Sequence, residues 1–217
     1  MSTIEVKKIV KAIQTSDGAG VKLKRSMGIP ELDFIDPFLM FDEFGSENKD
    51  DYIAGFPAHP HRGIETVTYM LAGRFKHEDS TGSKGEMGPG SVQWMAAAGG
   101  IIHSEMPIMK EGKLHGFQLW VNMPAKLKMS KPSYQNIEPQ EIPEFKDQDK
   151  KVKIIAGNFK NKIGSIGQVL PWFNIKIVNK KNKVGEIVFQ EKRLLFKNKD
   201  DIDKSATIYF FKRKIGD

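Results

Sequence analysis

The chain has 217 residues, a formal net charge of +7 and no cysteine, with 39% hydrophobic and 28% charged residues. This composition is that of an ordinary globular protein, long enough for one large domain or two small ones. The absence of cysteine excludes disulfides, thiolate metal sites and a cysteine nucleophile. No apolar run reaches the roughly 18 residues of a membrane span, and the first residues, MSTIEVKKIVKAI, lack the apolar core of a signal peptide. We therefore expect a cytoplasmic protein, or a nuclear one in a eukaryote, with no membrane partner.

The positive charge is concentrated near the end of the chain. Residues 148–217 hold 17 Lys and Arg against 7 Asp and Glu, whereas residues 1–147 hold 17 against 20. The excess is mostly lysine in polar segments, without a basic motif flanked by aromatic residues, which is typical of a solvated basic face. We expect no direct contact with nucleic acid, although a surface for an acidic partner is the alternative.

Short apolar or alternating runs recur along the chain between segments rich in Gly, Pro, Asn and Asp. They lie at residues 4–10, 21–27, 38–44, 65–73, 91–99, 116–123, 151–157, 173–179, 185–190 and 206–211. Many short strands joined by such turns predict an all-β sandwich or barrel. Helix is limited to single turns bounded by proline, at ELDFIDPF (31–38) and near PAKLKMSKP (124–132).

A domain boundary is predicted within residues 131–150, a polar stretch that contains three prolines and precedes the lysine-rich part. We expect an N-terminal domain over residues 1–135, which is long enough to close a barrel. The lysine-rich remainder, residues 136–217, offers few strands for an independent core.

Two histidine motifs predict a metal site. Side chains at positions i and i+2 of a strand point to the same side of a sheet, so His59 projects with His61, and His103 with Glu105. If the two strands are neighbours, three imidazoles and a carboxylate converge, a set that suits Fe, Mn, Ni, Cu or Zn and leaves coordination positions open. The spacing does not decide whether the carboxylate ligand is Glu105 or Glu65.

Three long segments carry a resemblance to a known family. GFPAHPHRGIETVTYMLAG (55–73), HEDSTGSKGEMGPGSVQWMAAAGGIIHSEMP (77–107) and LHGFQLWVNMP (114–124), with VKLKRSMGIPELDFIDPFLMFDEF upstream, closely resemble the pirins of the cupin superfamily. The resemblance covers roughly residues 5–157. It implies a bicupin, two stacked double-stranded β-helix (jelly-roll) barrels, with one metal, usually iron, in the N-terminal barrel. It assigns the ligands to His59, His61, His103 and Glu105.

The resemblance weakens after residue 157. The remaining segment has no histidine and fewer strands than the family's second barrel needs. We therefore expect a bicupin-like protein with a complete N-terminal cupin barrel and a truncated, cupin-like C-terminal β domain. An internally deleted copy of the family is the alternative.

The family's ligand set gives the other polar residues supporting roles. Glu65 becomes a candidate for orienting a ligand or for pairing with Arg62. His115, in an alternating strand, is expected to be a buried, hydrogen-bonded histidine, with a place behind the ligands as the alternative. His77, in the turn-rich KHEDSTG stretch, is expected to make a loop hydrogen bond, with contact at the edge of the site as the alternative.

The predicted function is that of a quercetin 2,3-dioxygenase, by the same resemblance. Fe(2+), or another divalent transition metal, would act on a flavonol-like substrate and dioxygen, with Glu105 as ligand and as the base that takes the hydroxyl proton. A flat apolar pocket rimmed by Phe56, Met95 and Phe117 would suit an aromatic ring. The alternatives are an iron-binding transcriptional co-regulator that docks on a regulatory protein without turnover, and a folded remnant with neither role.

Overall fold

The computed structural model describes the backbone of residues 4–109, 111–146, 151–159, 162–165, 175–180, 183–189, 193–197 and 207–213. Over these residues the regular structure is β-strand apart from three short 3-10 helices: η1 (Lys49–Asp51), η2 (Ala125–Leu127) and η3 (Pro139–Glu141). The predicted all-β class is confirmed. The described part of the chain contains no helix of the length and apolarity that crossing a lipid bilayer requires.

The two predicted helical turns have different outcomes. The segment PAKLKMSKP contains η2, as expected. ELDFIDPF forms no helix. Leu32 makes an isolated β-bridge with Ile29, which precedes the segment, and Ile35 makes one with Phe38.

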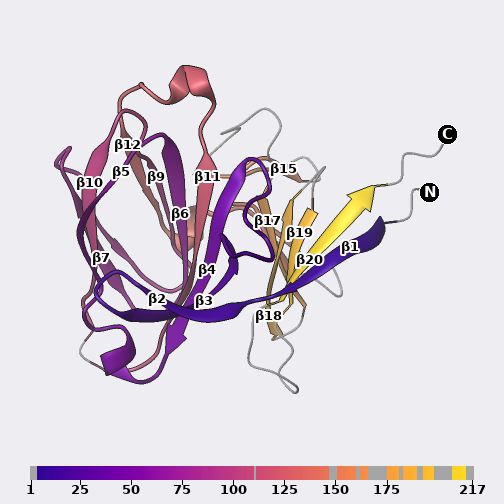
Figure 1. Cartoon of the computed structure of the whole chain (residues 1–217), viewed down its shortest axis with the longest axis horizontal. Helices are drawn as coiled ribbons and strands as arrows, with labels where there is room; N and C mark the ends of the chain where they lie inside the picture. The colour runs from indigo at the N-terminus through magenta and orange to yellow at the C-terminus, as the bar shows by residue number, and fades with distance from the viewer. Residues whose placement is uncertain are drawn as a thin grey trace. The chain divides into compact units, whose positions relative to one another are not determined.

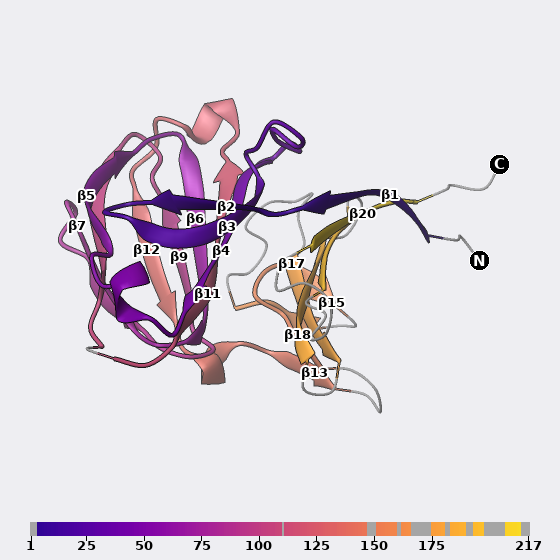
Figure 2. The same cartoon turned by 60° about the horizontal axis from the view of Figure 1, so that its bottom comes forward.

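The chain forms two compact units, one of residues Ile13–Pro139 and one of Met1–Ala12 with Gln140–Asp217. The first unit contains two antiparallel sheets, which Figures 1 and 2 show facing each other as the walls of a barrel. The larger sheet has the strand order β12-β9-β6-β11-β4-β3-β2, and the smaller has the order β5-β10-β7-β8. The bounds are β2 Ile13–Asp17, β3 Val21–Met27, β4 Phe38–Ser46, β5 Phe56–His61, β6 Ile64–Ala72, β7 Phe75–Asp79, β8 Lys84–Met87, β9 Val92–Ala96, β10 Ile101–Pro107, β11 Leu114–Asn122 and β12 Ser133–Ile137.

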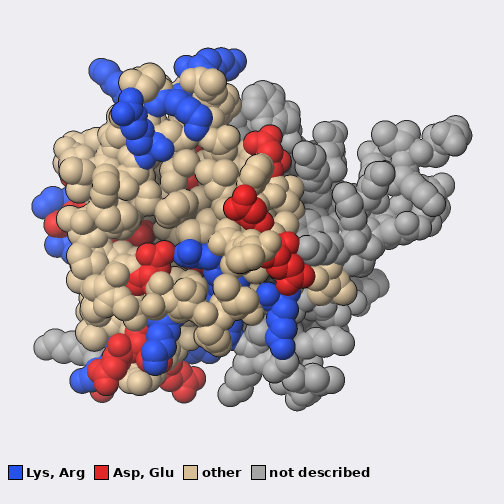
Figure 3. Space-filling view, in the orientation of Figure 1, with Lys and Arg blue, Asp and Glu red and all other residues tan. Residues whose placement is uncertain are grey.

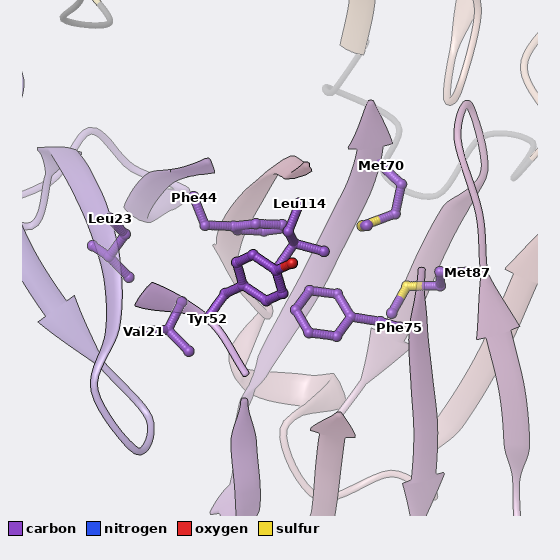
Figure 4. Close-up of a cluster of buried hydrophobic side chains, with 8 residues drawn as sticks. All are labelled: Val21, Leu23, Phe44, Tyr52, Met70, Phe75, Met87 and Leu114. Carbon is purple, nitrogen blue, oxygen red and sulfur yellow. The ribbon is translucent and has the colours of Figure 1, made fainter. Parts of the chain in front are cut away.

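An apolar cluster joins the two sheets of this barrel. Phe75 and Met87 come from the smaller sheet, and Phe44 from the larger. The rings of Phe44 and Phe75 meet edge to face, with 5.6 Å between their centroids. Each such buried side chain contributes roughly 1.5–3 kcal/mol. The whole cluster, drawn in Figure 4, is Val21, Leu23, Phe44, Tyr52, Met70, Phe75, Met87 and Leu114.

Strand β11 shows how residue alternation divides the barrel interior from the outer face of the larger sheet. Leu114 belongs to the internal cluster, so Gln118 and Trp120 share its inward side and Phe117 lies on the other. Gly116 also faces inward, where a Cβ would lie 2.6 Å from the Phe44 ring and 2.7 Å from the Tyr69 carbonyl oxygen. Glycine at this position therefore allows the close packing of β11 inside the barrel.

The second unit is also built of β-strands. The strand nearest the N-terminus, β1 (Ile4–Lys11), pairs with β20 (Thr207–Arg213), which pairs with β19 (Arg193–Lys197). Another sheet has the order β13-β14-β17-β18, and β15 pairs with β16. The bounds are β13 Glu144–Lys146, β14 Lys151–Lys153, β15 Asn158–Phe159, β16 Lys162–Ile163, β17 Ile175–Lys180 and β18 Lys183–Phe189.

The charged side chains of the first unit are mixed over the face in Figure 3. Lys and Arg gather at the end of the barrel that carries η2, and elsewhere on this face basic and acidic groups are interspersed.

Candidate metal centre

The two histidine motifs lie on neighbouring strands. Strands β5 and β10 pair antiparallel, with His59 opposite His103, and the register shifts between His103 and Glu105 so that Glu105 lies opposite Phe56. The pairing brings the two motifs together inside the barrel. The condition that the metal prediction required is met.

Three imidazole rings converge at this point. The Nε2 atom of His59 lies 3.0 Å from Nε2 of His61 and 3.0 Å from Nε2 of His103. The ring centroids are 4.4–5.0 Å apart. His103 is 1% exposed and His61 is 8% exposed, whereas His59 is partly exposed.

This donor set fits a first-row divalent ion. Ring nitrogens bound to one ion at about 2.1 Å and at right angles to each other lie about 3.0 Å apart, which is the separation of both nitrogen pairs around His59. Imidazole nitrogen is a good ligand for Fe, Ni, Cu and Zn. His59, His61 and His103 are the residues that would hold the ion.

The protonation states favour the same chemistry. Burial, together with the neighbouring His59, lowers the pKa of His61 to about 4. Burial and the other histidines lower the pKa of His103 to about 2. Both rings are therefore neutral at pH 7, and a neutral imidazole has the lone pair that a metal needs.

The Glu105 carboxylate lies beside the histidine cluster. It is 3% exposed, and burial raises its pKa to about 7, against a lowering by its hydrogen bond with Thr68. Its ligand atom lies within 4.8 Å of those of His103 and His77, a second group of potential ligands that shares His103 with the first. The Thr68 hydroxyl donates to Glu105 Oε1 at 3.3 Å and also contacts the Gln118 side-chain amide.

A cavity of about 200 Å³ gives access to these groups. It is lined by His59, His61 and Glu105 together with other apolar and polar side chains. A wider groove of about 530 Å³ shares Met40, Pro60, His61 and Trp120 with it. The other residues that line the cavity are Asp17, Leu23, Met40, Asp42, Phe44, Phe56, Pro60, Thr68, Phe75, Gln118 and Trp120.

Of the three predicted pocket residues, Phe56 lines the cavity, whereas Met95 and Phe117 are not among its lining residues. Phe56 lines the cavity and packs against Phe75, with 6.1 Å between the ring centroids. Met95 is fully buried in another apolar cluster, with Ala97 and Ile101. Phe117 projects from β11 on the side opposite Gln118 and Trp120, and its ring lies 5.5 Å from that of Phe41.

The predicted supporting residues Glu65 and His115 both pair with partners other than the metal ligands. Glu65 is buried and accepts a hydrogen bond of 2.9 Å from Trp94 Nε1. His115 pairs through Nε2 with Glu43 Oε1 at 2.9 Å. His115 is also adjacent in sequence to the inward-facing Leu114 and Gly116, so its side chain projects to the outer side of β11.

The loop contact expected for His77 is wrong. His77 lies inside β7, is fully buried and contacts both His103 and Asp79, because the turn begins only after Asp79. The sequence carries a signal for this: His77 and Asp79 are an i, i+2 pair of the same form as His103 and Glu105. Thr68 and Gln118 were missed because no comparable motif marks them.

Comparison with known proteins places the barrel in a family. The family model described as Pirin matches residues 20–121, which include the three clustered histidines and Glu105. Residues 20–121 therefore form a pirin-family domain. A pirin-like protein from Caulobacter vibrioides is 58% identical over 153 residues, 70% of this chain and 55% of the relative. The predicted resemblance is confirmed.

Two further comparisons extend the likeness of this chain. A Pseudomonas aeruginosa protein, provisionally named a quercetin 2,3-dioxygenase, is 58% identical over 145 residues, 66% of this chain and 51% of the relative. The chain thus spans about half the length of these curated relatives. The crystal structure of GK1651 from Geobacillus kaustophilus superposes with a TM-score of 0.70 at 26% identity, over 97% of this chain and 86% of that one. The predicted cupin fold class is confirmed.

Proposed function

We propose that this chain is a metal-dependent dioxygenase of the quercetin 2,3-dioxygenase type, with one Fe(2+) held by His59, His61 and His103 and with Glu105 as the fourth ligand and base. The observation that carries the proposal is the convergence of three imidazoles, with the His61 and His103 rings neutral, and the presence beside His103 of the Glu105 carboxylate, whose pKa is raised. The name of the 58% identical Pseudomonas relative supports the same reaction. Bound iron would supply the coordination positions for dioxygen and for the substrate oxygen.

Glu105 suits proton transfer at neutral pH. A catalytic base works best when its pKa lies near the working pH. In the metal-free site burial brings the pKa of Glu105 to about 7, so the carboxylate would act as the base when it is released from the ion. The Thr68 hydroxyl holds Oε1 and thereby fixes the position of the carboxylate. Glu105 would accept the proton of the flavonol 3-hydroxyl.

The cavity suits a flat aromatic substrate. Phe56 and Trp120 supply apolar surface, and the inner cavity of about 200 Å³ has room for one part of a flavonol. The adjoining groove of about 530 Å³ shares the Trp120 and Met40 walls and would receive the rest. Buried apolar walls of this kind also exclude water from the reacting atoms.

The test is elemental analysis of the purified, iron-reconstituted chain, followed by oxygen uptake with quercetin. We expect about one metal per chain and quercetin-dependent uptake, with a loss of about 10²–10⁴-fold in Glu105→Gln. Glu43→Gln, which alters a carboxylate that is outside the cavity lining, is the matched control and should turn over like the wild type. Iron binding without any uptake would contradict the enzyme and favour the co-regulator.

A further inference from the structure

A buried histidine and aspartate extend the imidazole cluster away from the cavity. In the β10–β7 pairing, Asp79 lies opposite His103 and His77 opposite Glu105. His77 is fully buried, with its Nδ1 atom 3.4 Å from Nδ1 of His103 and its Nε2 atom 3.1 Å from Oδ2 of Asp79. A continuous chain of contacts therefore runs from the cluster through His103 and His77 to Asp79.

The hydrogen positions along this chain follow from the metal site proposed above. If Nε2 of His103 is a ligand, its lone pair must be free and the ring hydrogen must be on Nδ1. That Nδ1–H donates to Nδ1 of His77, which must then carry its own hydrogen on Nε2 and donate it to Asp79. One arrangement of hydrogens satisfies all three side chains, and it presents the Nε2 lone pair of His103 to the cluster.

Asp79 is held in place to receive this bond. Its Oδ1 atom accepts hydrogen bonds from the backbone N–H of Thr81 at 2.8 Å, from the Thr81 hydroxyl at 2.6 Å and from the backbone N–H of Ser83 at 3.1 Å. The turn after β7 thus uses one carboxylate oxygen and leaves the other, Oδ2, to His77.

The His77 ring is fixed by packing as well. The Tyr134 ring stacks on it, with 4.3 Å between the centroids and 15° between the planes. Gly85 pairs with His77 across β7 and β8, and a Cβ at Gly85 would overlap the Tyr134 hydroxyl. Stacking therefore depends on glycine at this position.

We propose that His77, anchored by Asp79, is a positioning residue that fixes the tautomer and orientation of His103 for metal binding. The inference rests on the metal site of the proposed function and adds a residue outside its ligand set. Metal-binding histidines commonly donate their second ring N–H to a partner, and loss of the partner lowers metal affinity about 10–100-fold. His59 follows the same rule with a backbone acceptor, since its Nδ1 lies 2.8 Å from the Pro57 carbonyl oxygen.

The test measures metal affinity rather than turnover. Binding of Co(2+) to the full chain is titrated for the wild type, His77→Phe, His77→Gln, Asp79→Asn and Glu43→Gln. His77→Phe keeps a ring against Tyr134 but removes the acceptor, so the dissociation constant should rise about 10–100-fold. His77→Gln, whose amide oxygen can accept from His103, should restore part of the loss. Asp79→Asn should weaken binding, and Glu43→Gln, its control in the His115 pair, should bind like the wild type.

Each other outcome has a defined meaning. Unchanged affinity in His77→Phe would overturn the proposal while leaving the metal site intact, and absence of metal binding in the wild type would overturn the metal site itself. The Co(2+) spectrum at saturation should be the same in His77→Phe and the wild type. A changed spectrum would mean that His77 is itself a ligand, contrary to the proposal.

A measurement on the wild type covers the case in which the variants do not fold. Nitrogen-15 NMR of the metal-free chain should show His103 as the Nδ1–H tautomer and His77 as the Nε2–H tautomer. The opposite tautomer at His103 would overturn the proposal.

Discussion

The barrel contains two histidine–carboxylate pairs that have the same chemistry and different surroundings. His77 and Asp79 lie on one strand with fully buried side chains, and the second ring nitrogen of His77 faces His103. His115 and Glu43 lie on the neighbouring strands β11 and β4, with side chains 13% and 10% exposed. The His115 ring faces Phe117, with 5.9 Å between the centroids, rather than another imidazole. The two pairs therefore differ in the third group that the histidine contacts, which is a candidate metal ligand for His77 and a phenylalanine ring for His115.

The largest effect on metal affinity is expected from removing the His103 ring, which connects the His77–Asp79 pair to the histidine cluster. His103→Ala deletes one candidate ligand and leaves His77 without its imidazole partner, so metal affinity should fall by more than the roughly 100-fold upper limit for loss of an outer partner. Elemental analysis after dialysis, with unfolding followed by circular dichroism, measures this. If His103→Ala retained metal at the wild-type level, His103 would not be a ligand, and the contact of the His77–Asp79 pair with His103 would have no bearing on metal binding.

The two glycines beside the pairs provide the next test. Gly85→Ala places a Cβ against the Tyr134 hydroxyl and should destabilise the fold by about 1–3 kcal/mol. Gly45→Ala places a Cβ 3.0 Å from Cδ2 of His115, a longer approach than the overlap at Gly85, so its cost should be smaller. Urea unfolding measures both. Equal losses of stability in the two variants would show that the Tyr134 and His115 side chains are packed with similar rigidity.

A smaller effect on metal binding is expected from removing the second pair. His115→Phe leaves the buried Glu43 carboxylate without this partner, so the free energy of unfolding should fall by about 1–3 kcal/mol. Metal affinity should not change, because the ring points away from the cavity. A loss of affinity comparable to that of His77→Phe would contradict the comparison.

The smallest effect concerns a third carboxylate, Glu65, whose partner Trp94 does not titrate. Burial raises the pKa of Glu65, although the Trp94 hydrogen bond opposes the shift. The folded state therefore binds the Glu65 proton more readily than the unfolded state, and this group makes stability fall as the pH rises above the ordinary glutamate pKa. Gln at this position keeps an acceptor for Trp94 and removes the charge.

Glu65→Gln should accordingly gain stability relative to the wild type at pH 7 and show less gain at pH 4. Urea unfolding at the two pH values checks this sign. The same stability difference at both values would mean that Glu65 titrates alike in the folded and unfolded chains.

The sequence was informative where the signal is local. Alternation along a strand is a property of the backbone, so His59 with His61, and His103 with Glu105, could be assigned to common faces without a structure. The all-β class followed from the short runs and their turns for the same reason. The choice between Glu105 and Glu65 could not be made from spacing, because it depends on which side of the barrel wall each carboxylate occupies.

Partners that are distant in sequence were decided only by the tertiary structure. Strand β7 lies beside β10, which converts His77 from an expected loop residue into a contact of His103. Strand β1 pairs with β20 from near the other end of the chain, a pairing that no local pattern indicates. The sequence by itself determined the all-β class, many of the strands, and the faces that His59 shares with His61 and that His103 shares with Glu105. The closure of the barrel, which selects neighbours by packing rather than by local geometry, decided which of those side chains meet.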